Sequence, residues 1–234
     1  MFSGARPVRL SDADPRGRAR LDACARYLHD LSNDDTRDAA LPDDGSWVVR
    51  RTVVEVDKPL RYQERMETST WCGGTGSRWA ERRVSLVGHR GGRVEAAALW
   101  VYVDLSSFMP KRITQAFLDL YGAAAGGRQV GSKLQLAGPA DGDVVHERPW
   151  PLRRTDLDLL DHVNNAAYWC AVEELVGERP ELVAGPHRAV LEFAKQLGID
   201  DDVTLRWVDD ARGIRAWLQV DGTTHASLAL HRTP

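Results

Sequence analysis

The sequence predicts an α+β fold made of two similar halves, each with a buried helix packed against antiparallel strands. Three observations support this prediction. A short polar motif occurs twice, at 9–14 and at 153–158. Each copy runs into an apolar segment with helical spacing, and each of these segments is followed by several stretches of strand-like composition. A repeat that shares its downstream organisation indicates a duplicated architecture.

The two copies of the motif share the pattern Arg-x-Ser/Thr-Asp-x-Asp. RLSDAD at 9–14 and RRTDLD at 153–158 align without a gap. The alignment continues at the same offset, where small or apolar residues face each other in three pairs: Ala19 with Val163, Ala23 with Ala167, and Cys24 with Tyr168.

After the first copy, apolar residues from Leu21 to Leu31 keep the spacing of a helix. The polar run at 32–35 has a loop composition and should end this helix. Segments rich in Val, Thr and Trp then predict strands at 47–56, 65–71, 78–87 and 94–104. The glycine-rich stretch at 88–92 indicates a hairpin turn between the last two strands.

After the second copy the same order recurs. Residues 165–176 are apolar almost all round, which is typical of a helix buried on most sides. Gly177 and Pro180 mark the end of this helix. Strands are expected at 189–195, 203–208, 214–220 and 225–230. The segment 105–140 should link the halves, with a short amphipathic piece at 113–121.

A buried helix with a sheet curled around it is the hotdog arrangement, so the chain is expected to be a double hotdog. We place the N-terminal domain at 1–125 and the C-terminal domain, which carries the second motif copy, at 126–234. Two such sheets can join into one continuous sheet and so cover strand edges that would otherwise be exposed.

Composition excludes several classes of protein. Of 234 residues, 43% are hydrophobic and 28% charged, with a net charge of −3, as in an ordinary globular protein without a nucleic-acid partner. No apolar run approaches the roughly 18 residues of a membrane span, and no secretory signal is expected. Three cysteines without paired spacing argue against disulfides and a zinc site. We therefore expect a cytoplasmic protein that binds neither membranes nor metals.

The segment 153–168 concentrates the chemistry. Asp158 and His162 precede the apolar helix by a few residues. The backbone N–H groups of Val163, Asn164 and Asn165 lie where a helix start would leave donors free for an oxyanion. A structural alternative is open: the two asparagines would cap the helix, and the acidic residues with His162 would form a capping network.

These residues carry a family resemblance. The pattern Asp-x-Asp-x-x-x-His-Val-Asn-Asn-x-x-Tyr at 156–168 resembles the hotdog thioesterases. The tandem layout, together with WAERR at 79–83 and LWVYVD at 99–104, resembles the acyl-ACP thioesterases of plants and bacteria. The resemblance implies hydrolysis of fatty acyl-ACP, or of acyl-CoA, to free fatty acid with no metal or organic cofactor.

The resemblance also assigns residues. Asp158 and His162 match two catalytic positions, Asp158 as general base or nucleophile and His162 as the group that orients the thioester. The catalytic glutamate position falls on Gln196, which can hydrogen-bond a water molecule but cannot accept its proton. Leu160 and Leu197 stand where the family has asparagine and cysteine.

The departures keep other functions open. A non-catalytic or weakened acyl-binding protein is the main alternative, and a hotdog hydratase or dehydratase is a further one. In the first motif copy Arg18 replaces the histidine, so we expect that half to shape an acyl tunnel or dock a carrier. Trp47 and Trp100 are candidates for the tunnel or the core. The partner would be an acyl-carrier protein or CoA thioester, and the chain could act as a monomer or a homodimer.

Overall fold

The computed structural model describes residues 1–41 and 45–234. The N-terminal half holds the long helix α1 (Leu21–Ala39), the short helix α2 (Gln115–Ala125) and five strands: β1 (Phe2–Pro7), β2 (Ser46–Lys58), β3 (Arg65–Thr75), β4 (Trp79–Gly88) and β5 (Arg93–Val103). The C-terminal half holds α3 (Trp169–Glu178) and the other five: β6 (His146–Pro149), β7 (His187–Phe193), β8 (Val203–Asp209), β9 (Gly213–Val220) and β10 (Thr223–Arg232).

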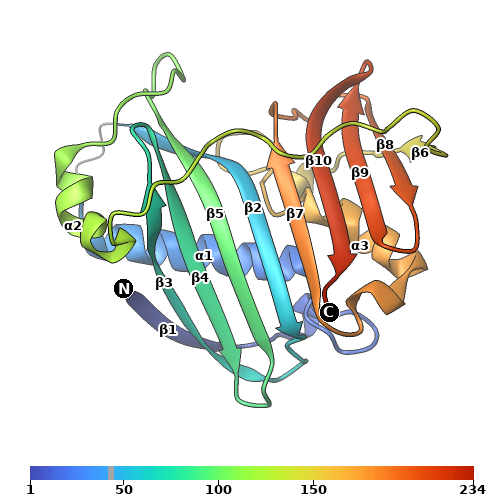
Figure 1. Ribbon diagram of the computed structural model, residues 1–234, viewed down its shortest axis with the longest axis horizontal. Helices are drawn as coiled ribbons and strands as arrows, with labels where there is room; N and C mark the ends of the chain where they lie inside the picture. The colour runs from blue at the N-terminus through green and yellow to red at the C-terminus, as the bar shows by residue number, and fades with distance from the viewer. Residues whose placement is uncertain (42–44) are drawn as a thin grey trace.

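The strands form one curved antiparallel sheet in the order β1-β3-β4-β5-β2-β7-β10-β9-β8-β6. Helices α1 and α3 contact each other on one face of this sheet, and α2 packs against β3 (Figure 1). The double hotdog predicted from the sequence is therefore confirmed.

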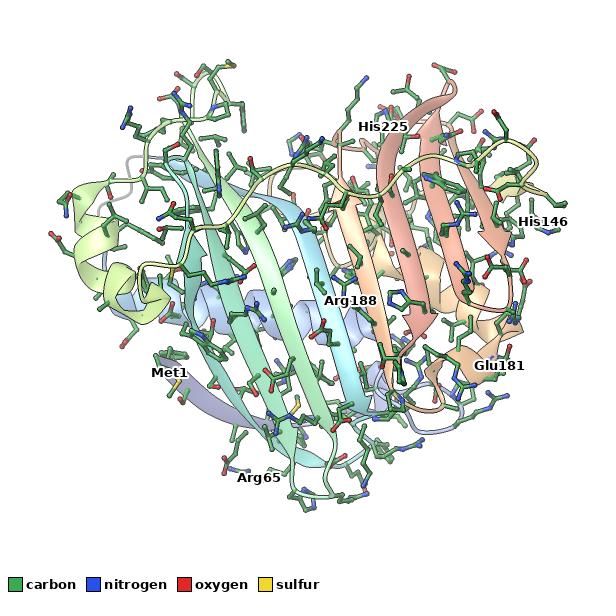
Figure 2. All side chains as sticks on the ribbon, viewed as in Figure 1. Met1, Arg65, His146, Glu181, Arg188 and His225 are labelled. Atoms are coloured by element: carbon green, nitrogen blue, oxygen red, sulfur yellow. The ribbon has the colours of Figure 1, made fainter. Side chains whose placement is uncertain are left out.

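The two halves meet where β2 pairs with β7, with Val53 opposite Val190. Residues alternate across this junction, as the pleat of a strand requires. Val54 and Leu191 are buried on the helix side. On the outer face Arg188 of β7, marked in Figure 2, pairs with Glu55 of β2 at 3.2 Å. The junction removes two free strand edges.

The segment between the halves crosses the outer face of the sheet (Figure 1). Backbone N–H groups of Gln135 and Leu136 donate to the buried carboxylate of Glu192 at 2.8 Å. The indole N–H of Trp217 donates to the carbonyl of Ala137 at 3.0 Å. The segment thus covers polar groups that the sheet alone would leave unpaired.

Helices α1 and α3 both differ from the expected boundaries. Helix α1 continues through the polar run at 32–35 to Ala39, because Asp35 is buried and bonded to Arg82 and Tyr121. Helix α3 begins at Trp169, after a turn at 165–168 in which the side chain of Asn164 accepts from the N–H of Ala166 at 2.8 Å. The contacts of Asp35 therefore set the end of α1, and the hydrogen bond of Asn164 sets the turn before α3, rather than the local composition. Within the described residues, no helix combines the length and apolar character that crossing a membrane requires.

Candidate active site

Both motif copies open into one cavity of about 1110 Å³ at the junction of α1 and α3. Asp14 and Arg18 line it from the first copy, and Asp158, Asn164 and Asn165 line it from the second. The duplication therefore places two related polar loops around a shared space, and their contacts decide which of them is free to act.

Backbone hydrogen bonds and the side chain of Asp158 hold the loop of the second copy in shape. The N–H of Asp158 donates to the carbonyl of His162 at 2.8 Å. In return Oδ1 of Asp158 accepts from the N–H groups of Leu160 and His162, at 2.8 and 3.4 Å. Oδ2 accepts no hydrogen bond from any residue that the structure describes, so one carboxylate oxygen remains for a substrate or water.

Of the three N–H groups expected to bind an oxyanion, two are already engaged. Val163 donates to the carbonyl of Leu197 at 3.1 Å, and Asn164 donates to the carbonyl of Asp156 at 2.7 Å. These two backbone groups therefore do not face a ligand, which corrects the expectation for them. The N–H of Asn165 finds no acceptor in the described part of the chain, and Asn165 lines the cavity. Of the three expected donors, only this N–H remains available among the described residues.

Two other expected residues lie away from this space. His162 is half-buried, its Nδ1 is buried without a partner among the described residues, and it is not part of the cavity wall. Gln196 is exposed just after β7, with its carbonyl 2.8 Å from Nδ1 of His225. Leu160 is 65% exposed, whereas Leu197 is buried and donates its N–H to the Tyr168 hydroxyl at 3.0 Å. Of the site residues expected from the sequence, the cavity wall contains Asp158, Asn164 and Asn165.

A cysteine also lines the cavity. Burial raises the pKa of the Cys170 thiol to about 11, and the charge of Asp22 adds to this shift. At neutral pH the side chain is therefore a thiol and a poor nucleophile. A covalent mechanism through this residue is disfavoured.

A second, more apolar pocket of about 560 Å³ adjoins the cavity, with Ser32, Asn33 and Trp100 common to both. Its wall carries Trp47, Tyr102, Phe117 and Tyr121. The Trp47 ring lies 4.9 Å from that of Tyr102 and 5.0 Å from that of Phe117. An apolar group of extended length would find a desolvated site here, beyond the polar loop.

In the first copy, side chains fill the corresponding place. Arg18 pairs with Asp14 at 3.0 Å and with Glu173 of α3 at 2.5 Å. Glu173 also accepts the N–H of Leu21, at the start of α1, at 2.6 Å. Burial opposes the charge of Arg18, but hydrogen bonding to Glu173 and its charge raise the pKa of the guanidinium above its ordinary value. This loop is closed by an ion-pair network.

Comparison with known proteins agrees with this architecture. The model of the acyl-ACP thioesterase N-terminal domain matches residues 1–121, and that of the C-terminal domain matches residues 141–229. The chain belongs to the acyl-ACP thioesterase family. An uncharacterised protein of Mycobacterium tuberculosis is 33% identical to this chain over 224 residues, which cover 95% of this chain and 88% of the relative.

Proteins named as thioesterases are also similar to this chain. The chloroplastic oleoyl-acyl carrier protein thioesterase 2 of Arabidopsis thaliana is 27% identical over 67% of this chain and 46% of its own length. The solved 12:0-ACP thioesterase of Umbellularia californica superposes with a TM-score of 0.78 at 19% identity, covering 98% of this chain and 96% of its own. An acyl-ACP thioesterase of Bacteroides thetaiotaomicron gives 0.79 at 14% identity, with the same coverage. These two structures support the fold of this family member.

One residue of the cavity was not expected. His29 of α1, in the N-terminal half, lines the same space as Asp158 and Asn165. The sequence carries no signal for this residue, because its approach to the second motif copy depends on how α1 and α3 pack together. No cluster of three or more His, Cys, Asp or Glu side chains suited to a metal ion occurs in the described residues of this thioesterase family member.

Proposed function

We propose that this chain hydrolyses fatty acyl thioesters, carried by acyl-carrier protein or CoA, to free fatty acid and thiol in the cytoplasm, without a cofactor. The observation that supports it best is the pairing of Asp158 with Asn165 in one cavity. Among the described residues, one carboxylate oxygen of Asp158 accepts no hydrogen bond and the N–H of Asn165 has no acceptor.

The chemistry needs a stabiliser on the carbonyl oxygen and a nucleophile on the carbonyl carbon. The N–H of Asn165 precedes the positive end of α3, where negative charge is favoured. Asp158 activates a water molecule as general base or attacks the carbonyl directly. The C–S bond then breaks, and the products are a carboxylic acid and a thiol. His162 holds the Asp158 loop through backbone contacts.

The two adjoining spaces suit the two ends of the substrate. The acyl chain would pass Trp100 into the aromatic pocket in the N-terminal half. The phosphopantetheine arm, which both carriers share, would occupy the polar cavity. Arginine side chains suited to its phosphate line that cavity: Arg6, Arg16, Arg20 and Arg153.

The experiment measures free thiol released from acyl-ACP and acyl-CoA of several chain lengths. Asp158→Asn keeps an oxygen to accept from Leu160 and removes the charge, so we expect turnover to fall by about 10²–10⁴, the usual contribution of a general base. Asp161→Asn is the matched control, because Asp161 lies in the same loop with φ 60°, which asparagine tolerates. Binding of fatty acid without thiol release from any substrate would favour the non-catalytic acyl-binding alternative.

A further inference from the structure

The alignment of the two halves continues through both helices. At the offset that pairs Asp14 with Asp158, Leu21 pairs with Asn165, and His29 pairs with Glu173. Leu21 and Asn165 stand at or just before a helix start, while His29 and Glu173 lie within α1 and α3. These helices pack against each other, so each can extend a side chain to the other's start.

The first copy shows this exchange. The carboxylate of Glu173 reaches from α3 to the start of α1, where it accepts the Leu21 N–H at 2.6 Å and binds Arg18 at 2.5 Å. A carboxylate oxygen thus occupies the place where a helix start holds an anion. A residue at the position of Glu173 in one helix therefore lies at the start of the other helix.

The surroundings of His29 agree with the same exchange in the other direction. It lines the main cavity with Asp158, and a small gap with Asn165 and Trp100. Its ring meets the Trp100 ring edge-on, with centroids 6.1 Å apart. No hydrogen bond to either ring nitrogen exists among the described residues, so the imidazole is uncommitted beside the free N–H of Asn165.

We propose that His29, supplied by the N-terminal half, takes the general-base role in the hydrolysis in place of Asp158. The proposal rests on the proposed thioesterase function. The neutral imidazole takes one proton from water as the water oxygen bonds to the carbonyl carbon. As the C–S bond breaks, that proton passes to the sulfur, and the products are acid and thiol. Asp158 orients the water and stabilises the imidazolium.

The electrostatic setting of His29 suits a neutral base. Burial lowers the pKa of His29 below the ordinary histidine value, while the charges of Asp30 and Asp158 oppose this shift. Arg82 of β4 lines the small gap beside the ring, whereas β5 and α3 contribute the uncharged Trp100 and Trp169. The imidazole is therefore unprotonated at neutral pH and can accept a proton there.

The test compares His29→Gln and His29→Ala with His89→Gln, a control at an exposed histidine in the β4–β5 hairpin. Thiol release is measured against pH for each variant whose unfolding temperature shows that it is folded. We expect both His29 variants to lose about 10²–10⁴ in kcat/KM. We expect added imidazole to restore part of the activity of His29→Ala, because that variant opens space for it. The control should match the unmodified protein.

The pH profile separates a base from a structural role. In the unmodified protein the acid limb of kcat/KM should lie below the ordinary histidine value of about 6.5, because burial lowers the pKa of His29. His29→Gln should remove that limb from its residual activity. An active unmodified protein with no limb in this range, or a folded His29→Gln with near-normal activity, would overturn the proposal and leave the thioesterase function standing. No thiol release from the unmodified protein would refute the function itself.

Discussion

The two motif copies begin with the same pattern and reach opposite states. In the first, Arg18 and Glu173 fill the space in front of α1 and satisfy the Leu21 N–H. In the second, histidine and asparagines leave a loop whose carboxylate and Asn165 N–H face a cavity. In a duplicated fold, one of two equivalent places can thus hold a structural ion pair while the other stays open to a cavity.

The ion pair should matter most for stability. Glu173→Gln leaves the charge of Arg18, 5% exposed, with weaker compensation. Removing one partner of a buried pair typically costs about 3–5 kcal/mol in the free energy of unfolding. Urea denaturation should show this loss, while Glu174→Gln, at the exposed neighbour on α3, should show almost none. Equal midpoints for the two variants would mean that the first copy is not held by Glu173.

Asp14 and Asp158 occupy equivalent positions in the two copies. We expect substitutions there to change the free energy of unfolding less than Glu173→Gln does, and to separate stability from turnover. Asp14 accepts from the N–H of Arg16 and from both the backbone and the guanidinium of Arg18. Asp14→Asn should lower the unfolding free energy by about 1.5–3 kcal/mol, the contribution of a hydrogen bond to a charged group. Turnover per folded molecule should be kept, whereas Asp158→Asn should lose turnover and keep stability. A reversed pattern in parallel assays would exchange the roles of the two copies.

The first copy should also shape the acid limit of stability. Burial opposes ionisation of Asp22, but hydrogen bonds from Arg20 and Arg26 lower the pKa of its carboxyl below the ordinary 3.8. A lowered folded-state pKa stabilises the fold above the unfolded value, and this contribution is lost as pH falls through the folded value. Unfolding temperature should thus drop below about pH 4, less steeply in Asp22→Asn. Parallel curves for both proteins would contradict this.

The smallest effect is expected at Cys170. With its pKa raised to about 11, the thiol should resist alkylation at neutral pH, although it borders the cavity. Cys170→Ser should therefore retain turnover close to that of the unmodified protein. Rapid inactivation by iodoacetamide, abolished in Cys170→Ser, would instead indicate a reactive cysteine at the site.

Local sequence pattern predicts the helices and strands of this chain but not the contacts between segments that are distant in sequence. The helices and strands follow from hydrophobic periodicity, because each element buries one face or stripe. The end of α1 was placed too early, because the burial of Asp35 against Arg82 depends on a strand distant in sequence. For the same reason the chain pattern alone did not show that Val163 and Asn164 already donate to Leu197 and Asp156.

The sequence by itself determined the duplicated α+β architecture, the family resemblance and the segment around Asp158. All of these are encoded in short-range pattern and in one repeated motif. Only the tertiary structure decided which copy is open and which residues meet there. Gln196 falls outside the cavity, while His29 enters it from the other half. The reason is physical: a side chain's reach across packed helices depends on how the helices lie together.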